Sequence, residues 1–315
     1  MPSSIPAYAM PDTVSVRIHD LGSEIREVPA EPMLAPAPRQ RSRRWSARIH
    51  KSVAVIIIVV ICVSAVFTEW LVPFDPVAIS LSDTFAPPST GHWMGTDQLG
   101  RDILSRAMYG ARISLAIALI VVTAAGVLGT LLGVVAGYVG GAIEAVIMRL
   151  TDMQLAFPAV ILALVLAGVI GVNITNLVIV LTLANWARFA RVARGDVLSL
   201  RTREFVLLAR LAGAGPWWIM LRHIVSNLLG TFVVLATLDI GSVIILEATL
   251  SFLGLGVQPP LASWGSMIAE GRGQLSNAWW VCVMPGAVLI LTVLAINLLG
   301  DALREKLNPV IPEIW

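Results

Sequence analysis

The side chains that most often do chemistry are sparse in this sequence and stand apart from one another. A phosphate-binding P-loop needs a glycine directly before its lysine, but Lys51 follows His50 and Lys306 follows Glu305. These are the two lysines of the chain, so it cannot hold its own P-loop ATPase site. None of the four histidines begins a His-Glu-x-x-His zinc motif: His19, His50, His92 and His223. The sequence therefore predicts no catalytic residue and no metal site.

The remaining reactive side chains also favour a chain that is not an enzyme. Cys62 and Cys282 fall inside apolar segments, where a thiol behaves as a small hydrophobe and no disulfide framework is implied. Serines in such segments have no plausible histidine partner for nucleophilic catalysis. The net charge is +2, which gives no argument for nucleic-acid binding. We expect no cofactor to be bound by this chain.

Composition and apolar patterning predict an all-α membrane protein. Hydrophobic residues make up 57% of the chain and charged ones 13%, whereas about a quarter of a soluble domain is charged. A membrane-spanning helix takes roughly 20 apolar residues. We predict six transmembrane helices, at residues 53–72, 113–139, 155–172, 174–187, 228–255 and 279–299. The third and fourth are short, and Gly171, Val172 and Asn173 at their junction predict a tight outer turn.

The distribution of basic residues predicts the orientation. An even number of spans places both termini on one side, and basic residues gather in cytoplasmic segments. With both termini in the cytoplasm, Arg101, Arg106, Arg112 and Arg272 are the basic residues left outside. The inner ones are Arg39, Arg41, Arg43, Arg44, Arg48, Lys51, Arg149, the run 188–222, Arg304 and Lys306. We therefore predict a multi-pass protein of the inner (plasma) membrane with cytoplasmic N- and C-termini.

These assignments divide the chain into consecutive regions. Residues 1–50, rich in Pro, Ser and charge, are expected to be a disordered cytosolic tail. Residues 51–72 form an accessory transmembrane helix, 73–111 a periplasmic segment, 112–305 the core with five spans, and 306–315 a cytosolic tail. The core includes a long cytosolic loop at 194–227, far longer than a helical hairpin needs.

The loop at 194–227 is predicted to contain two short helices. Residues 204–212 combine helix formers with an apolar face, and the run from Gly213 to Pro216 ends that helix. Pro216 suits the first position of a second helix, over 217–223. The expected product is a helix–turn–helix that projects into the cytosol.

Two acidic residues fall within the predicted fifth span. A charge near the centre of a membrane helix costs about 2.5–3.5 kcal/mol on insertion scales, so Asp239 and Glu247 should face a bundle interior or a water-filled path. Eight residues apart, they lie within about 80° of each other around the helix. A buried structural pair and a role in a solute pathway both remain open.

The cytosolic loop resembles the coupling loop, or EAA loop, of ABC-importer permeases. The matching residues are Glu204, Phe205, Ala209, Arg210, Gly213, Ala214, Arg222, His223 and Asn227. In that family the loop docks on a separate ATPase and transmits its closure to the spans. This sequence departs from the pattern at Leu207 and Leu208, where Glu and Ala are usual, and at Ser226, where Pro is usual.

Other segments resemble one branch of the family, the second permease subunit of dipeptide and oligopeptide importers, a branch that also handles nickel. The resemblance covers roughly residues 68–309. The matching runs are 94–106, 109–115, 137–141, 148–152, 157–158, 247–260, 263–265 and 297–301. In the first of these, Asp97, Arg101, Asp102 and Arg106 can pair with one another. They form either a structural cap over the helix ends or a contact for a solute-binding protein.

The resemblance implies a type I ABC-importer permease fold with cytosolic coupling helices. Its expected partners are a homologous second permease subunit, two ABC ATPase subunits or domains that bind ATP and Mg, an extracytoplasmic solute-binding protein, membrane lipid and a peptide substrate. The resemblance also favours Glu247 over Asp239 as the functionally placed acid.

Two alternatives to peptide transport stay open. The same branch imports nickel chelates, glutathione and other small solutes. The altered residues Leu207 and Leu208 also permit a non-transporting membrane assembly or sensor subunit that has kept the fold.

Overall fold

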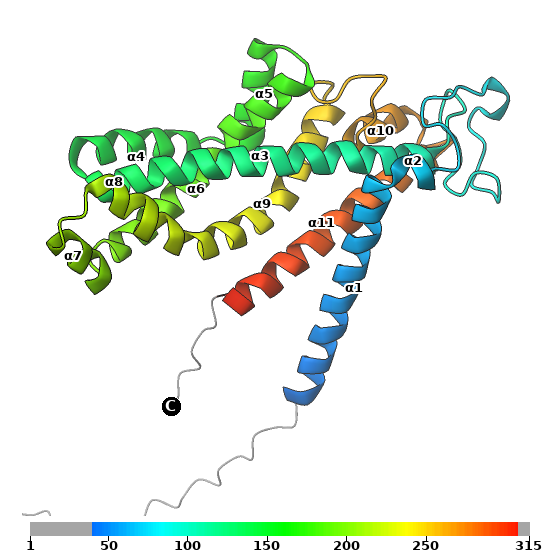
Figure 1. Ribbon diagram of the computed structural model, residues 1–315. Helices are drawn as coiled ribbons and strands as arrows, with labels where there is room; N and C mark the ends of the chain where they lie inside the picture. The colour runs from blue at the N-terminus through cyan, green and yellow to red at the C-terminus, as the bar shows by residue number, and fades with distance from the viewer. Residues whose placement is uncertain (1–39, 308–315) are drawn as a thin grey trace, which may run out of the picture. The chain divides into compact units, whose positions relative to one another are not determined.

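Regular structure in the computed structural model, which describes residues 40–307, is helical, and no strand occurs within that range (Figure 1). The predicted all-α class is therefore confirmed. Residues 40–44 belong to an N-terminal unit and the rest to a second unit. The longer helices are α1 (Gln40–Val66), α3 (Ile103–Val139), α4 (Gly141–Leu155), α5 (Ala159–Ile170), α6 (Ile174–Leu200), α9 (Ser226–Phe252) and α11 (Trp280–Leu307). The shorter elements are α2 (Thr68–Leu71), η1 (Leu81–Asp83), α7 (Glu204–Leu211), α8 (Pro216–Trp218), η2 (Ile219–Val225), α10 (Trp264–Gly271) and η3 (Arg272–Gln274).

Each of the six predicted spans coincides with a helix, but the helices differ in how well they suit a membrane. Among the described residues, three are long and apolar enough to cross one unaided: Ile103–Val139, Pro216–Phe252 and Trp280–Lys306. A fourth crossing is possible if α4 and α5, which meet at a 96° bend, count as one broken span. The apolar part of α1, Ser52–Val66, is shorter, and α6 carries charges in its second half. The tight turn between α5 and α6 is present at residues 171–173.

Helix α3 is the longest element and packs along α6. Its 37 residues extend about 55 Å, which exceeds the roughly 30 Å of a hydrocarbon core. Glycines line the contact: a Cβ on Gly129 would lie 2.2 Å from the carbonyl oxygen of Trp186, and one on Gly133 would lie 2.4 Å from that of Ala190. Small residues let helix backbones approach closely in membranes. The α3–α6 pair therefore depends on these glycines.

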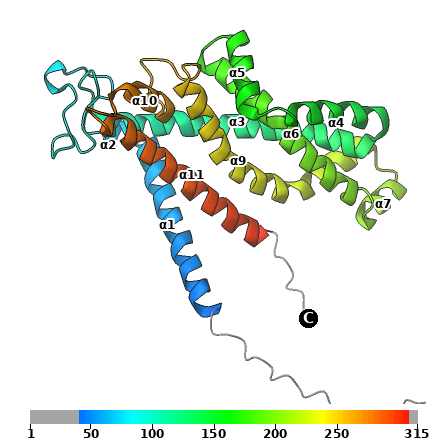
Figure 2. The same ribbon diagram turned by 180° about the vertical axis from the view of Figure 1, so that it is seen from behind.

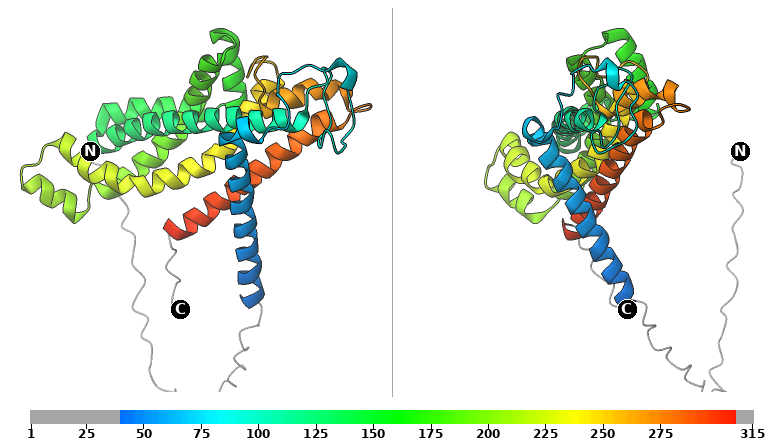
Figure 3. Two further views of the ribbon diagram at one scale, coloured as in Figure 1. Left: turned by 45° about the vertical axis from the view of Figure 1, so that its right-hand side comes forward. Right: turned by 90° about the vertical axis from the view of Figure 1, so that its right-hand side faces the viewer.

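The other helices pack around this pair. Helix α4 lies alongside α3 (Figures 1 and 3), and α9 contacts α3, α6 and α11. A single apolar cluster in this region includes Val121 of α3, Leu181 of α6 and Ile244 of α9, all fully buried.

The two ends of α3 carry different structures. The loop 72–102 and α10 lie at its N-terminal end, whereas α7 and α8 lie at its C-terminal end (Figures 1 and 2). The two assemblies therefore lie at opposite ends of a helix that is longer than a bilayer core is thick.

Several predicted boundaries differ from the structure. Helix α1 begins at Gln40, so residues 40–50 are helical where a disordered tail was predicted; residues 1–39 and 308–315 lie outside the described range. Helix α3 begins at Ile103 rather than near 112, because Asp102 caps it there by accepting a hydrogen bond from the Ser105 backbone N–H. The link between the second and third spans is itself a helix, α4.

Candidate functional site

The loop at 194–227 contains the first predicted short helix and the turn after it, and this turn has a defined cap. Helix α7 ends at Leu211, and Gly213 follows with a φ of +82°. The Ala214 N–H donates to the Ala209 carbonyl at 3.0 Å, and the Gly213 N–H donates to the Arg210 carbonyl at 3.0 Å. These two bonds make a Schellman motif, which favours glycine at its left-handed position. The conformation of this turn therefore depends on Gly213.

The second half of the loop differs from the prediction. A separate short helix was expected over 217–223, but Pro216 begins a helix that continues through η2 and α9 to Phe252. The π-helical turn η2 is where a backbone hydrogen-bond register changes, a feature that is frequent at functional sites. The loop is thus continuous with α9.

A buried cluster holds α7 against the body of the protein. Val206 is fully buried between Ile219 and Ile224 of η2, and the same cluster includes Val134 of α3 and Val197 of α6. The Arg201 Nη1 donates to the Gly137 carbonyl at 2.9 Å, which ties the end of α6 to α3. The loop is therefore packed against α3, α6 and the start of α9.

The structure brings together five of the predicted loop residues. Phe205, Ala209, Gly213, Ala214 and His223 line an open groove of about 750 Å³ between α7 and η2. The other residues that line it are Leu208, Ala212, Gly215 and Trp218. Ring centroids lie 4.9 Å apart for Trp218 and His223 and 6.0 Å apart for Phe205 and His223. The groove is therefore apolar with aromatic walls.

The remaining predicted loop residues lie elsewhere. The Arg210 guanidinium lies over the Tyr138 ring, 5.1 Å from its centroid. The Asn227 side chain donates to the His223 carbonyl at 2.6 Å, and Glu204 and Arg222 are exposed. These four do not join the groove.

Large apolar side chains are exposed beside the groove. The exposed fraction is 84% for Leu211, 68% for Trp217 and 64% for Leu208. Contiguous exposed apolar surface marks a place where another molecule binds. Leu208, one of the positions that departs from the coupling-loop pattern, thus adds to this surface.

The charged residues predicted on the outer side form a largely buried network rather than an exposed patch. Asp97 accepts from Arg101 Nε at 2.7 Å and contacts Arg106 Nη1 at 3.1 Å. Glu270 of α10, which the sequence did not single out, contacts Arg101 at 3.0 Å and Arg106 at 2.9 Å. Asp97 and Arg106 are each 2% exposed, so this network acts as a cap that joins the loop, α3 and α10.

Asp102 differs from its three predicted partners. Besides capping α3, it lies 2.9 Å from Nδ1 of His92 and pairs with neither arginine. The predicted mutual pairing therefore holds for Asp97, Arg101 and Arg106, while Asp102 ties the preceding loop to the start of α3.

Both acids of the fifth span face the protein interior, as predicted. Asp239 is 1% exposed and lies 2.6 Å from Nη1 of Arg188 on α6. Glu247 is fully buried and accepts from Ser251 at 2.7 Å and from Ser114 of α3 at 3.1 Å. The two acids therefore have different partners: one is paired with a cation and the other with hydroxyls. Arg188 was missed because the sequence shows it only as the first charge after the fourth apolar segment.

The Glu247 partners extend to the loop after α9. The Ser251 hydroxyl accepts from the Val257 N–H at 3.1 Å and lies 3.3 Å from the hydroxyl of Ser263, which caps α10. Trp264 then donates its indole N–H to the Ala107 carbonyl at 3.0 Å. Glu247 thus anchors the segment that carries α10 into the outer cap.

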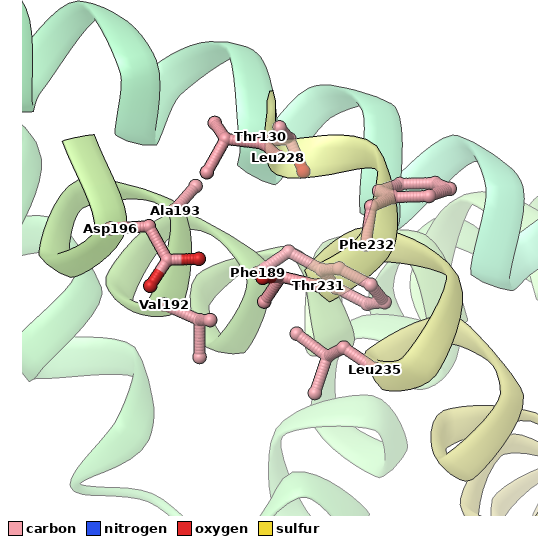
Figure 4. A pocket seen from close by; sticks show the side chains of 9 residues that line it. All are labelled: Thr130, Phe189, Val192, Ala193, Asp196, Leu228, Thr231, Phe232 and Leu235. Atoms are coloured by element: carbon pink, nitrogen blue, oxygen red, sulfur yellow. The ribbon is translucent and has the colours of Figure 1, made fainter. Parts of the chain in front are cut away.

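A small pocket lies between α3, α6 and α9, where Figure 4 shows the Asp196 carboxylate among apolar side chains and two threonines. The lining residues are Thr130, Phe189, Val192, Ala193, Asp196, Leu228, Thr231, Phe232 and Leu235. Its volume of about 10 Å³ is room for about one water molecule. This pocket is therefore too small to be the route of a solute.

Comparison with known proteins agrees with this architecture. Residues 129–311 match the family described as the binding-protein-dependent transport system inner membrane component. The chain belongs to this family. The permease is 41% identical to the probable D,D-dipeptide transport system permease protein DdpC of Escherichia coli (strain K12), over 81% of this chain and 85% of that protein.

Further relatives are named as nickel or as peptide transport permeases. The permease is 42% identical to the nickel transport system permease protein NikC of Escherichia coli (strain K12), over 85% of this chain and 95% of that protein. It is 38% identical to the di/tripeptide transport system permease protein DppC of Pseudomonas aeruginosa (strain UCBPP-PA14), over 84% of this chain and 90% of that protein. The predicted family resemblance is therefore confirmed. The permease is a multi-pass inner-membrane subunit of an ABC importer, a class that works with ATPase and binding-protein partners.

Proposed function

We propose that the permease forms part of the translocation path for di- or oligopeptides and couples this path to a separate ATPase through α7 and η2. The observation that carries the coupling is the apolar groove, bordered by exposed Leu208, Leu211 and Trp217, on a turn continuous with the fifth span. Such a surface suits a protein partner, and its rigid packing suits transmission of a movement.

The peptide substrate is supported by relatives with peptide-transport names at 38–41% identity over most of the chain. The proposed complex contains a homologous second permease, two ABC ATPase subunits or domains that bind ATP and Mg, and an extracytoplasmic solute-binding protein. Both termini would lie in the cytoplasm, which puts α7 on the side where ATP is hydrolysed and the cap of Asp97, Arg101 and Arg106 outside.

A nickel chelate is the second candidate substrate, because the nickel permease is as similar to this chain as the peptide permeases are. A transport assay separates the candidates. The permease would be co-expressed with a second permease, ATPases and a binding protein of the same importer class, and the complex reconstituted in liposomes.

Import would be measured with a labelled dipeptide, a labelled tripeptide and labelled nickel with a histidine chelator, each with and without ATP. ATP-dependent entry of a peptide supports the proposal. Entry of nickel alone would show that the substrate is the nickel chelate. An intact complex that hydrolyses ATP and imports none of the three would support the alternative of a non-transporting subunit.

A further inference from the structure

Arg188 and Asp239 form an ion pair whose two members differ sharply in exposure. The side chain of Asp239 is 1% exposed, whereas that of Arg188 is 54% exposed. Asp239 Oδ1 accepts from Nη1 of Arg188, and within residues 40–307 the buried Oδ2 has no hydrogen-bond partner. The carboxylate is therefore enclosed by protein, while more than half of the Arg188 side chain is exposed.

Two further arginines on α6 show what an ordinary pair looks like in this permease. Arg191 pairs with Asp152 of α4, and both side chains are more than half exposed. Arg194 pairs with Glu144 of α4, at intermediate exposure. Arg188 differs because its counter-ion lies inside a membrane-spanning helix, near the middle of α9.

The surface around Arg188 does not suit lipid. It is the first charged residue after the apolar half of α6, and the exposed positions that follow it at helical spacing carry little apolar surface. They are Arg191, Gly195 and Ser199. Arg188 was predicted to begin the cytoplasmic run 188–222, but its contact with Asp239 near the middle of α9 places its guanidinium within the length of that membrane-spanning helix. An arginine at this depth faces a water-filled cavity or protein in nearly every case, and such residues mark solute pathways. This face of α6 therefore borders water or another subunit.

We propose that Arg188 lies on the translocation path and binds the carboxylate of the solute in transit, with Asp239 as the residue that positions its guanidinium. The inference rests on the proposed function and names the chemical group that this subunit recognises. A guanidinium has five N–H donors in a planar fork that matches a carboxylate. The contact with Asp239 engages Nη1 and fixes the orientation of the fork, and the exposed side of the fork faces the path. The partial neutralisation by Asp239 keeps the contact weak enough for release.

The test compares a dipeptide with its C-terminal amide, which lacks the carboxylate. Uptake of both is measured in the reconstituted complex for wild type, Arg188→Gln, Arg188→Gln with Asp239→Asn, and the control Arg191→Gln. The same binding protein delivers both solutes to every variant, so its own preference cancels when the free-to-amide ratio is compared between variants. Arg188→Gln alone leaves the buried Asp239 carboxylate without its counter-ion. The double variant avoids this, because Asp239→Asn removes the charge as well.

We expect the KM for the free dipeptide to rise about tenfold or more in both Arg188 variants, since a hydrogen bond to a charged group is lost. Uptake of the amide and of both solutes by Arg191→Gln should stay near wild type. Four results would overturn the inference: unchanged uptake by Arg188→Gln, recovery in the double variant, equal loss for both solutes, or loss of the second permease from the complex. Recovery would make the pair structural. If wild type imports neither solute, the proposed function fails first, and this inference with it.

Discussion

The turn at Gly213 offers the sharpest test of coupling, because its backbone conformation can be perturbed without touching a span. Its φ of +82° is a left-handed conformation, and no atom lies within 4 Å of the place where a Cβ would be added. A substitution there therefore meets no steric clash, so the effect of an uncharged residue comes from backbone strain. Gly215 also has open space around it but an ordinary φ of −69°, which makes it a matched control two residues away.

The expected magnitude follows from this conformation. A residue with a side chain loses about 1–2 kcal/mol in the left-handed region, which changes the population of the native turn by a factor of about 5–30. Asparagine tolerates this region better than alanine or aspartate does. We therefore expect Gly213→Asp and Gly213→Ala to weaken coupling, Gly213→Asn to weaken it less, and Gly215→Ala to resemble wild type. Aspartate adds a charge beside the apolar groove, so it should have the largest effect.

Three quantities should be measured on the same preparation: co-purification of the ATPase, its hydrolysis rate and solute uptake. Membrane insertion and expression should be normal in every variant, because Gly213 contacts no span. Loss of uptake per ATP hydrolysed, or loss of the ATPase, would agree with a role in transmission. Wild-type uptake by Gly213→Asp would refute the reasoning, and equal damage by Gly215→Ala would show that the strained turn is not the cause.

Three further predictions concern topology, the N-terminus and the outer cap. In a background without native cysteines, a cysteine at Ser89 should react with an impermeant thiol reagent added to intact cells and one at Thr202 only after permeabilisation; the reverse pattern would contradict the orientation. Deleting the residues before Gln40 should leave complex assembly and transport largely intact, as measured by co-purification and uptake, because no predicted span is removed; loss of assembly would reveal a docking element. Glu270→Gln should lower the free energy of unfolding by about 3 kcal/mol, since it leaves the buried Arg106 and the largely buried Arg101 with one carboxylate between them. Glu69→Gln breaks the exposed pair with Arg112 and should cost below about 1 kcal/mol, and heating the detergent-purified protein before size-exclusion chromatography compares the two; equal midpoints would refute the buried cap.

Local features of the candidate site were predictable from the sequence. Gly213 and Pro216 are a stop and a start for helices, and the structure has the turn between them. The continuation from Pro216 into α9 was not predictable in this way. The sequence gives no signal for the π-helical turn η2, whose Ile219 and Ile224 lie in one buried cluster with Val206.

The sequence by itself determined the membrane class, the places of the helices and the two acids that must face inward, since each of these depends on apolar runs or on the cost of a charge in lipid. Only the tertiary structure decided the partners. Asp239 meets Arg188 across 51 residues, Glu247 meets Ser114 across 133 and Glu270 meets Arg101 across 169. Many arginines and serines could serve an isolated carboxylate equally well. The choice among them depends on which helix faces lie together, and the close approach of α3 to α6 along their glycine contact is part of what sets those faces.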